Sequence, residues 1–497
     1  MQQPELERLA APFPGDALSL GIDVGTQGVR AALLDAEGLL LGTGSHPLRS
    51  GRRDGVRHEQ DPREWWDAVC RATKQALAGR GHRPLAAVAL DATSGTILVQ
   101  DPGLQPLTAG LMYNDGRAAA QAERAIAAGS HVWARFGVRM QPSWALPRAI
   151  WLLEQGLVPA GARIVHQGDH LVSQLTGEQT ATDSSQALKT GVDLTTLRWP
   201  VDVFDSLGLD VALLPEVVLP GTVIGQVSPA AAAATSIPAG TPVKAGMTDG
   251  CASQIACGAV LPGRWSSALG TTLVLKGSTT APIIDPTGAV YSHRNPDGGW
   301  LPGGASSVGA GIIARDFPGA DLDALTVAAA DWEPAGGICY PLAGPGERFP
   351  FVAPAATGFS AGVPDNDAAR FAAVLQGIAF TERLAFHRLR ELGADVVGPI
   401  SFVGGAAGNE YWNQLRCDLL GVEVVRPQSA DAAVGMAILA ASPAGAVGRT
   451  AEKMVQPSRS YQPDHTRAAR FDAAYQEFVG ALRDRGWLQT APQRALR

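Results

Sequence analysis

The chain of 497 residues carries a formal net charge of −7, with hydrophobic residues at 46% and charged residues at 18%. This length predicts more than one domain, and the composition is typical of a protein that buries sizeable hydrophobic cores. No run of lysine or arginine stands out, which argues against nucleic acid or an anionic membrane as the main partner, since both need a concentrated basic footprint.

The cysteines and the amino-terminal residues indicate a cytoplasmic protein. The five cysteines are scattered and never spaced as C-x-x-C: Cys70, Cys251, Cys257, Cys339 and Cys417. This pattern predicts neither a zinc site nor a disulfide framework. The first 17 residues hold acids and prolines where a signal peptide needs a basic end and an apolar core. No apolar stretch is long enough to cross a bilayer.

The first expected elements are two strands joined by a glycine turn. A strand starts at Leu18 with LSLGIDV, the turn covers residues 25–28, and VRAALL continues as the second strand. A helix should follow from Pro62, with Asp61 as its N-cap and Glu64 three residues after the cap.

The second half of the chain opens on a related pattern. Gly270, Thr271 and Thr272 lie between two strand-like segments, as Thr26 lies in the first turn. Two halves that each start with a Gly-Thr hairpin indicate an ancient duplication, although glycine turns are common. Residues 116–208 alternate helix-like pieces with loops and suit an insertion that covers a cleft. Strands mixed with helices through both halves predict an α/β protein.

Further helices are predicted downstream from their boundary signals. A long helix around residues 374–389 should end at Gly393, and a shorter one should end at Gly421. Ser429 is expected to cap the helix DAAVGMAILAA. An amphipathic helix over residues 471–482 should close the chain.

Asp23 is an ionisable residue inside an apolar strand, directly before the first glycine turn. A buried carboxylate is costly without a partner. One interpretation is a carboxylate satisfied by the amides of its own turn. The other is a carboxylate that orients Mg²⁺ beside phosphates, while backbone N–H groups of residues 25–28 and the Thr26 hydroxyl contact phosphate oxygens. The turn does not match the Walker P-loop, whose lysine is absent.

Asp249 follows a short strand-like run and precedes a helix of small residues, with Gly246 and Gly250 allowing a sharp turn. Phosphoryl transfer to an alcohol needs a carboxylate that accepts the hydroxyl proton, and Asp249 fits that need. The competing interpretation is an Asx-turn or a helix-capping aspartate.

Residues 403–409, VGGAAGN, place small residues between a strand and a helix. Such a loop lets a flat ring and its phosphates approach the backbone closely. Asn409 could hydrogen-bond a base or ribose, with Trp412 packed nearby. From this loop alone, a tight turn capped by Asn409 is favoured.

Taken together, these segments resemble one family. In order, GIDVGTQGVR, EQDPREWW, AGMTDG, SALGTTLVLKG, FVGGAAGNEYWNQLRCDLLGVEV and DAAVGMAILA resemble the FGGY carbohydrate kinases from about Leu18 to Ala441. The resemblance implies a two-domain α/β actin-like ATPase (ribonuclease H-like) fold with ATP in the interdomain cleft. It implies a sugar-binding domain at 18–262, a nucleotide-binding domain at 263–442, and a linker with a C-terminal helix at 443–497.

The resemblance also implies roles for individual residues. Asp249 becomes the catalytic base and Asp23 the carboxylate associated with Mg²⁺. The sugar site is expected to contain Asp23, Ser94, Asp249 and Gly250. The residues expected to bind ATP are Thr26 and Gln27 in the first hairpin, Gly270, Thr271 and Thr272 in the second, and Gly404, Gly405 and Asn409 in the adenosine motif.

Two positions depart from the family pattern. Gly28 stands where many members carry a second hydroxyl, which puts that phosphate contact in doubt. Arg148 stands where lysine is usual, and we expect this to alter a structural ion pair more than catalysis.

The choice of sugar depends on less specific residues. Ser94, in DATSGT, stands where xylulose kinases usually place a histidine, and the Arg-Glu pair of glycerol kinases is absent. The segments DATSGTILVQD, YSHRNPDGGWLPGGASS and YPLAGPGERFPF resemble instead the cyanobacterial and plant kinases of D-ribulose. A serine leaves room and one hydroxyl to sense the sugar. Asn114 and Asp115 are weaker candidates that equally suit a surface turn. D-ribulose is the predicted substrate and D-xylulose the alternative.

Two other functions share this fold. Chaperone-type or filament ATPases need no sugar base, and a silent sugar-binding regulator would not need both phosphate loops. The aspartates and the adenosine motif favour the kinase. The sequence leaves a homodimer open.

Overall fold

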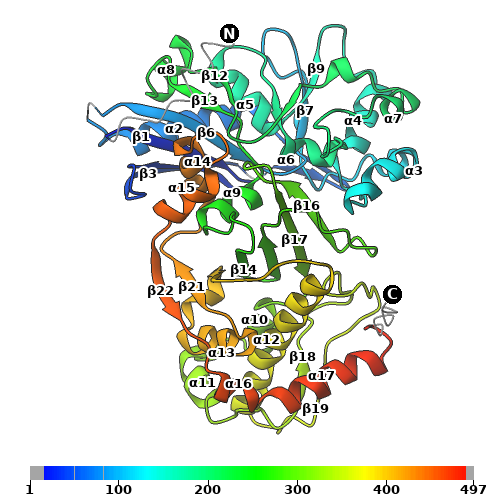
Figure 1. Cartoon of the computed structure of the whole chain (residues 1–497). Coiled ribbons are helices and arrows are strands. Elements are labelled where there is room, and N and C mark those ends of the chain that lie inside the picture. Colours follow the sequence, from blue (N-terminus) through cyan, green and yellow to red (C-terminus); the bar gives the residue numbers. More distant parts are fainter. Residues whose placement is uncertain (1–15, 50, 82, 489–497) are drawn as a thin grey trace.

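The computed structural model describes residues 16–49, 51–81 and 83–488, which form two α/β lobes, one above the other in Figure 1. The amino-terminal segment in which we expected no signal peptide lies, up to residue 15, outside the described residues. Within the described part of the chain, no helix has the length and hydropathy needed to cross a membrane.

The upper lobe is built on a six-stranded sheet in the order β12-β13-β6-β1-β2-β3. Its strands are β1 (Leu18–Val24), β2 (Gly28–Leu34), β3 (Leu40–Pro47), β6 (Leu85–Ala92), β12 (Val223–Gln226) and β13 (Pro242–Lys244). β1 and β2 form the predicted antiparallel hairpin, and β1 runs parallel to β6. β1 and β6 are buried along their whole length. The nearly all-apolar sequence of β6, LAAVALDA, is typical of such a strand, whereas β1, LSLGIDV, has Ser19, Gly21 and Asp23 at alternate positions.

The lower lobe contains a seven-stranded sheet in the order β16-β17-β15-β14-β20-β21-β22. Its strands are β14 (Trp265–Leu269), β15 (Leu273–Gly277), β16 (Val290–Arg294), β17 (Trp300–Ser306), β20 (Ile400–Val403), β21 (Val424–Pro427) and β22 (Pro457–Tyr461). β14 forms an antiparallel hairpin with β15 and runs parallel to β20.

The two sheets repeat one topology. The run β3-β2-β1-β6-β13-β12 in the upper lobe corresponds to β17-β15-β14-β20-β21-β22 in the lower lobe, and the last pair is antiparallel in both. This agreement of strand order and direction supports the internal duplication that the two Gly-Thr hairpins indicate.

Helices cover both sheets. They are α2 (Pro62–Leu77), α3 (Ala119–Trp133), α4 (Ala145–Glu154), α5 (Gln167–Thr176), α6 (Ser184–Ala187), α7 (Val201–Ser206), α8 (Pro229–Thr235), α9 (Asp249–Ala256), α10 (Gly311–Asp316), α11 (Leu322–Ala329), α12 (Asp367–Glu391), α13 (Glu410–Leu420), α14 (Ala432–Ala441), α15 (Val447–Met454), α16 (His465–Ala469) and α17 (Asp472–Asp484). Asp61 caps α2 and Gly421 ends α13 in the left-handed conformation, as predicted.

The cap predicted for α14 is wrong. Asp431 is the N-cap, because its side chain accepts a hydrogen bond from the amide of Ala433. Ser429 lies outside the helix and its hydroxyl accepts from the amide of Asp431. The capping preferences of serine and aspartate are similar, so the sequence did not separate these two candidates two residues apart.

Three smaller sheets complete the fold. One has five strands: β4 (Arg52–Asp54), β5 (Arg57–Gln60), β8 (Gly110–Leu111), β7 (Ile97–Gln100) and β9 (Arg163–His166). The others pair β10 (Thr182–Asp183) with β11 (Val217–Val218), and β18 (Ile338–Tyr340) with β19 (Phe359–Ala361). Residues 116–208 contribute α3 to α7, β9 and β10, and much of this segment forms a separate apolar core beside the main sheet.

The helices α14 and α15 return from the second half of the chain to the upper lobe (Figure 1). A Cβ on Gly21 of β1 would lie 1.9 Å from the carbonyl oxygen of Ala433, and a Cβ on Gly435 would lie 1.9 Å from that of Ala252. Glycines at both positions therefore let α14 lie directly against β1 and α9.

Candidate active site

The candidate acidic residues lie at the carboxyl ends of neighbouring parallel strands. Asp23 of β1 is paired in register with Asp91 of β6, and Thr248 forms a parallel bridge with Ala92. Asp249 follows directly. Ligands of open α/β sheets bind at this edge, because the strand ends and their loops create a crevice there.

Asp23 is 5% exposed and its carboxylate lies 3.4 Å from the guanidinium of Arg30. Burial raises the pKa of Asp23, whereas hydrogen bonding from the neighbouring carboxyl group of Asp91 lowers it. The charges of Asp431 and Asp249 raise this pKa further, and the charge of Arg30 lowers it. Among the described residues, no amide of the turn at 25–28 donates a hydrogen bond to the Asp23 carboxylate, which accepts from the guanidinium of Arg30. The turn amide of Gly25 donates to the carbonyl of Gly28 instead.

Asp91 is the fully buried neighbour of Asp23, and the sequence analysis overlooked it. Neither of its carboxyl oxygens accepts a hydrogen bond from any described donor. Burial, and then the charge of Asp23, raise the pKa of Asp91 well above its ordinary value. Its signal in the sequence was the same as that of Asp23, an ionisable residue inside an apolar strand.

Asp249 is the first residue of α9 and is exposed to solvent. Thr248 is the N-cap residue, so Asp249 is not the capping aspartate of the competing interpretation. One of its oxygens accepts a 2.6 Å hydrogen bond from the amide of Gly250. The other oxygen makes no hydrogen bond with the described residues, which leaves it able to take a proton from a ligand.

Ser94 lies in the turn between β6 and β7. Its hydroxyl is buried and makes no hydrogen bond with any described residue. Its carbonyl accepts from the ammonium group of Lys189 at 3.0 Å. A buried hydroxyl without a partner is costly, so this position suits a group that a polar ligand completes.

Asn114 and Asp115 are held by other protein groups. Asn114 is exposed in a turn closed by the bond from the amide of Asp115 to the carbonyl of Met112, which agrees with the surface-turn interpretation. Asp115 departs from it, because it is 1% exposed and forms an ion pair with Arg117 at 2.9 Å. Its carboxylate also accepts from the amide of His58. Asn114 contacts the His58 ring.

Arg148 also differs from our expectation. It is fully buried and donates to the carbonyls of Gly95 at 2.6 Å, Ser143 at 2.9 Å and Tyr113 at 3.2 Å. No ion pair with a described carboxylate is present. The fork of the guanidinium therefore ties the Ser94 turn to α4, and burial lowers its pKa to about 10.

Side chains of β5 and α2 hold the backbone of the first predicted phosphate hairpin in place. The carbonyl of Thr26 accepts from the side-chain amide of Gln60 at 2.9 Å, and Gln60 accepts from the indole of Trp65 at 2.8 Å. The carbonyl of Gln27 accepts from the amide of Leu48. Both carbonyls are therefore bonded within the protein. Thr26 itself is half-buried and Gln27 is exposed.

The second hairpin, Gly270–Thr272, is fixed by the start of α10. The amides of Ala310 and Gly311 donate to the carbonyls of Gly270 and Thr271 at 2.8 and 3.2 Å. A Cβ on Gly270 would meet no atom within 4 Å, so this position borders open space. The hairpin makes no hydrogen bond with Thr26 or Gln27 of the other lobe in the part of the chain that the structure describes.

The predicted adenosine loop lies beside this hairpin. Gly404 has φ of +88°, and a Cβ there would lie 2.5 Å from the carbonyl oxygen of Leu269, so only glycine fits. A Cβ on Gly405 would meet nothing within 4 Å, which leaves the loop open to a ligand. Asn409 caps α13 through the amide of Trp412 and donates to the hydroxyl of Thr326 at 3.0 Å.

Trp412 does not line this loop. It is 2% exposed, and its indole donates to the carbonyl of Leu375 at 3.0 Å in the core of the lower lobe. An amphipathic side chain such as tryptophan suits either the edge of a ligand loop or a protein core. In the structure its ring is buried against α12.

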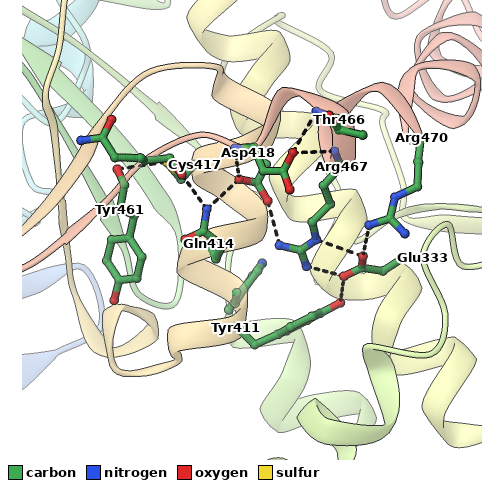
Figure 2. Close-up of polar contacts among 12 residues, drawn as sticks. Glu333, Tyr411, Gln414, Cys417, Asp418, Tyr461, Thr466, Arg467 and Arg470 are labelled. Atoms are coloured by element: carbon green, nitrogen blue, oxygen red, sulfur yellow. Dashed lines mark hydrogen bonds and ion pairs between the residues drawn. The ribbon is translucent and has the colours of Figure 1, made fainter.

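A polar cluster around Glu333 contacts α13, the helix that follows the adenosine loop, as Figure 2 shows. Arg467 of α16 bonds Glu333 and, at 2.7 Å, Asp418 of α13. Tyr411, two residues after Asn409, donates to Glu333 at 2.7 Å, and Arg470 adds a second cation. The segment before the C-terminal helix therefore holds the helix that follows the adenosine loop.

The residues present fit MgATP. No ready-made cluster of three or more metal ligands exists among the described residues. Mg²⁺ is commonly held by one or two carboxylates together with substrate phosphates, and Asp23 beside the first hairpin is compatible with that arrangement. When bound, the ion would neutralise phosphate charge.

Comparison with known proteins decides the family. Residues 18–256 match the N-terminal domain, and residues 266–444 the C-terminal domain, of the FGGY family of carbohydrate kinases. The chain belongs to this family. It is therefore an ATP-dependent carbohydrate kinase with the two-domain actin-like ATPase fold.

Individual relatives agree with this assignment. The chain is 31% identical over 434 residues to a xylulose kinase of Streptomyces rubiginosus, covering 85% of this chain and 87% of the relative. It is 24% identical over 433 residues to a gluconokinase of Bacillus licheniformis, covering 82% and 84%. A xylulose kinase structure from Lactobacillus acidophilus superposes with a TM-score of 0.82 at 22% identity, over 95% of this chain and 98% of that one. A Plasmodium falciparum glycerol kinase with ADP gives 0.80 at 16% identity, over 97% and 100%.

Proposed function

We propose that this kinase transfers the γ-phosphoryl group of ATP, with Mg²⁺, to the terminal hydroxyl of a ketopentose and forms the 5-phosphate. The observation that carries the proposal is the exposed carboxylate of Asp249, which stands at the strand-end edge beside Asp23. Asp249 accepts the hydroxyl proton as the new bond forms. The backbone N–H groups of the two glycine hairpins would donate to the phosphate oxygens. Asp23 would hold Mg²⁺, which would neutralise part of the phosphate charge.

D-xylulose is the first candidate acceptor and D-ribulose the second. The xylulose kinase of Streptomyces rubiginosus, 31% identical along most of both chains, supports D-xylulose over the D-ribulose that the sequence segments predict. The small Ser94 in place of a histidine supports D-ribulose. The two sugars differ in the configuration of one hydroxyl, so a single buried contact suffices to separate them.

The experiment is ADP release from MgATP in a panel of D-xylulose, D-ribulose, L-ribulose, glycerol, D-gluconate and no sugar. The largest kcat/KM with one of the first two ketoses would support the proposal and choose between them. Preference for gluconate or glycerol would overturn the ketopentose while keeping the kinase. Equal turnover with and without every sugar would contradict the acceptor site itself.

A further inference from the structure

Lys276 brings a cation from the lower lobe to the catalytic edge of the upper lobe. It lies on β15 with its side chain half-buried, and its ammonium nitrogen is 3.8 Å from the sulfur of Cys251 on α9. Cys251 follows Asp249 by two residues. The lysine therefore reaches the first turn of the helix that carries the proposed base.

Two glycines make room for this side chain. A Cβ on Gly303, the cross-strand partner of Lys276 on β17, would lie 3.2 Å from its Cγ. A Cβ on Gly250 would lie 2.7 Å from its ammonium nitrogen. Side chains at these positions would meet the stem and the head of the lysine, so Lys276 depends on both glycines for its present path.

Lys276 has no ion-pair partner in the described part of the chain. Among the described residues, no carboxylate forms an ion pair with it, and the thiol of Cys251 is its one hydrogen-bonding contact. The charges around it are of both signs, and the carboxylate of Asp249 acts on Lys189 and His293 in the direction opposite to Lys276. Lys189 is a second cation, and Lys276 contributes, after burial, to lowering the pKa of Lys189 to about 8 and that of the buried His293 to about 3. A partly desolvated cation without a partner suits an anionic ligand.

We propose that Lys276 is a catalytic residue that binds the oxygens of the transferring phosphoryl group beside Asp249. This proposal rests on the kinase function proposed above. The bond between the γ-phosphorus and the oxygen bridging to the β-phosphate breaks, and ADP leaves with the electron pair. The bond from phosphorus to the acceptor oxygen forms, and the acceptor proton passes to Asp249. Lys276 donates hydrogen bonds to the equatorial oxygens of the transferring group, over which the negative charge spreads.

The test compares Lys276→Met and Lys276→Arg with the wild type and with Lys453→Met. Lys453 is the matched control, because it is exposed and its ion pair with Glu37 is long, at 3.8 Å. Lys276→Met should lower kcat by about 100-fold or more, as loss of a transition-state donor does. The KM of the sugar should stay within about threefold. Lys276→Arg should recover part of the loss, and Lys453→Met should behave as wild type.

Binding gives a readout that does not depend on turnover. Calorimetry should show that Lys276→Met binds MgADP like the wild type but loses the extra affinity that aluminium fluoride, a mimic of the transferring group, gives to the MgADP complex. Gly250→Ala retains the charge and displaces it, so it should reduce kcat and aluminium fluoride binding in the same direction.

Three results would overturn the proposal. A raised KM for the sugar with unchanged kcat would show that Lys276 binds the sugar rather than the transferring phosphoryl group. Unchanged kcat and KM would show that Lys276 has no role in the reaction. Lost MgADP binding together with a lowered Tm would make it structural. If no sugar stimulates the wild type, the ketopentose proposal fails separately. The role of Lys276 can then still be tested by aluminium fluoride binding and by slow ATP hydrolysis, in which water accepts the phosphoryl group. Lys276→Met should reduce both.

Discussion

The side-chain amide of Gln60 donates a 2.9 Å hydrogen bond to the carbonyl oxygen of Thr26, and the same side chain accepts from the indole of Trp65. Gln60 is 6% exposed and lies at the end of β5, directly before α2. A residue 34 positions away along the chain thereby fixes the turn between β1 and β2.

Replacing Gln60 by glutamate should weaken this brace. A carboxylate still accepts from Trp65 but cannot donate to the carbonyl of Thr26, so the turn gains freedom. We expect kcat/KM for ATP to fall by about 10-fold, the equivalent of one hydrogen bond. Steady-state kinetics at saturating sugar measures this. Trp65→Phe removes only the bond to Gln60 and should show a smaller loss of kcat/KM. An unchanged kcat/KM in Gln60→Glu would show that the bond from Gln60 to Thr26 does not affect catalysis.

Asp249→Asn should abolish most turnover while preserving the nucleotide site. The amide keeps the shape of the side chain but cannot accept the hydroxyl proton, and general-base catalysis typically contributes about 100- to 10,000-fold. We expect a fall in kcat of at least about 100-fold with the Kd of MgADP unchanged by calorimetry. Near-normal turnover would exclude Asp249 as the base.

Ser94→Ala tests the sugar site. Its buried hydroxyl has no partner among the described residues, so removing it should stabilise the free protein slightly or leave it unchanged. The kcat/KM for the preferred ketose should fall by about 10-fold, because the partner hydroxyl on the sugar is stranded. Ser130→Ala, on the exposed face of α3, serves as the control. Equal losses for D-xylulose and D-ribulose would contradict a role in discriminating between them.

The buried ion pair between Arg416 and Glu382 should support the stability of the lower lobe. Both side chains are inaccessible to solvent and joined by contacts of 2.7 and 2.9 Å, and Ser267 bonds both. Arg416→Met leaves Glu382 buried without its cation and should lower the free energy of unfolding by about 3–5 kcal/mol. The matched surface pair is Arg71–Asp67, more than half exposed, where Arg71→Met should cost less than about 1 kcal/mol. Urea unfolding compares the two, and equal losses would contradict this account.

His170 should contribute a loss of stability on mild acidification. Its ring is 2% exposed and bonds the side chain of Gln100 at 2.6 Å, and burial lowers its pKa to about 4 from the ordinary 6.5. The unfolded chain therefore takes up a proton first, and stability is lost as the pH falls from about 6.5 to about 4, by roughly 3 kcal/mol in total. Thermal unfolding across this range should show a flatter profile for His170→Gln. His131→Gln, on the exposed side of α3, should keep the wild-type slope.

The elements and the family could be predicted from local sequence because their signals are local. Glycines in turns, Asp61 before Pro62, and alternating apolar residues each act within a few positions of the chain. The carboxylates Asp23 and Asp249 could also be identified from the sequence, since charged residues next to apolar strands are unusual.

Residues whose roles depend on distant partners could not be predicted in this way. Gln60 and Lys276 act on segments that the fold alone brings near them. The buried Asp115 bonds the amide of His58, which lies 57 positions away along the chain. Arg148 was expected in an ion pair but bonds carbonyls, whose positions are set by backbone conformation rather than by residue type. Capping by Asp431 rather than Ser429 was decided by where the chain enters α14.

The placement of α14 against β1 and α9 has a consequence for recombination within the family. The sequence divides near its middle, but the upper lobe contains a helix encoded close to the end of the gene. A chimaera joined at the midpoint would therefore put a foreign α14 against the native β1, where Gly21 and Gly435 allow no added methyl group. Viable exchanges of the upper lobe need two crossovers, so that residues 18–256 and the late helix are inherited together.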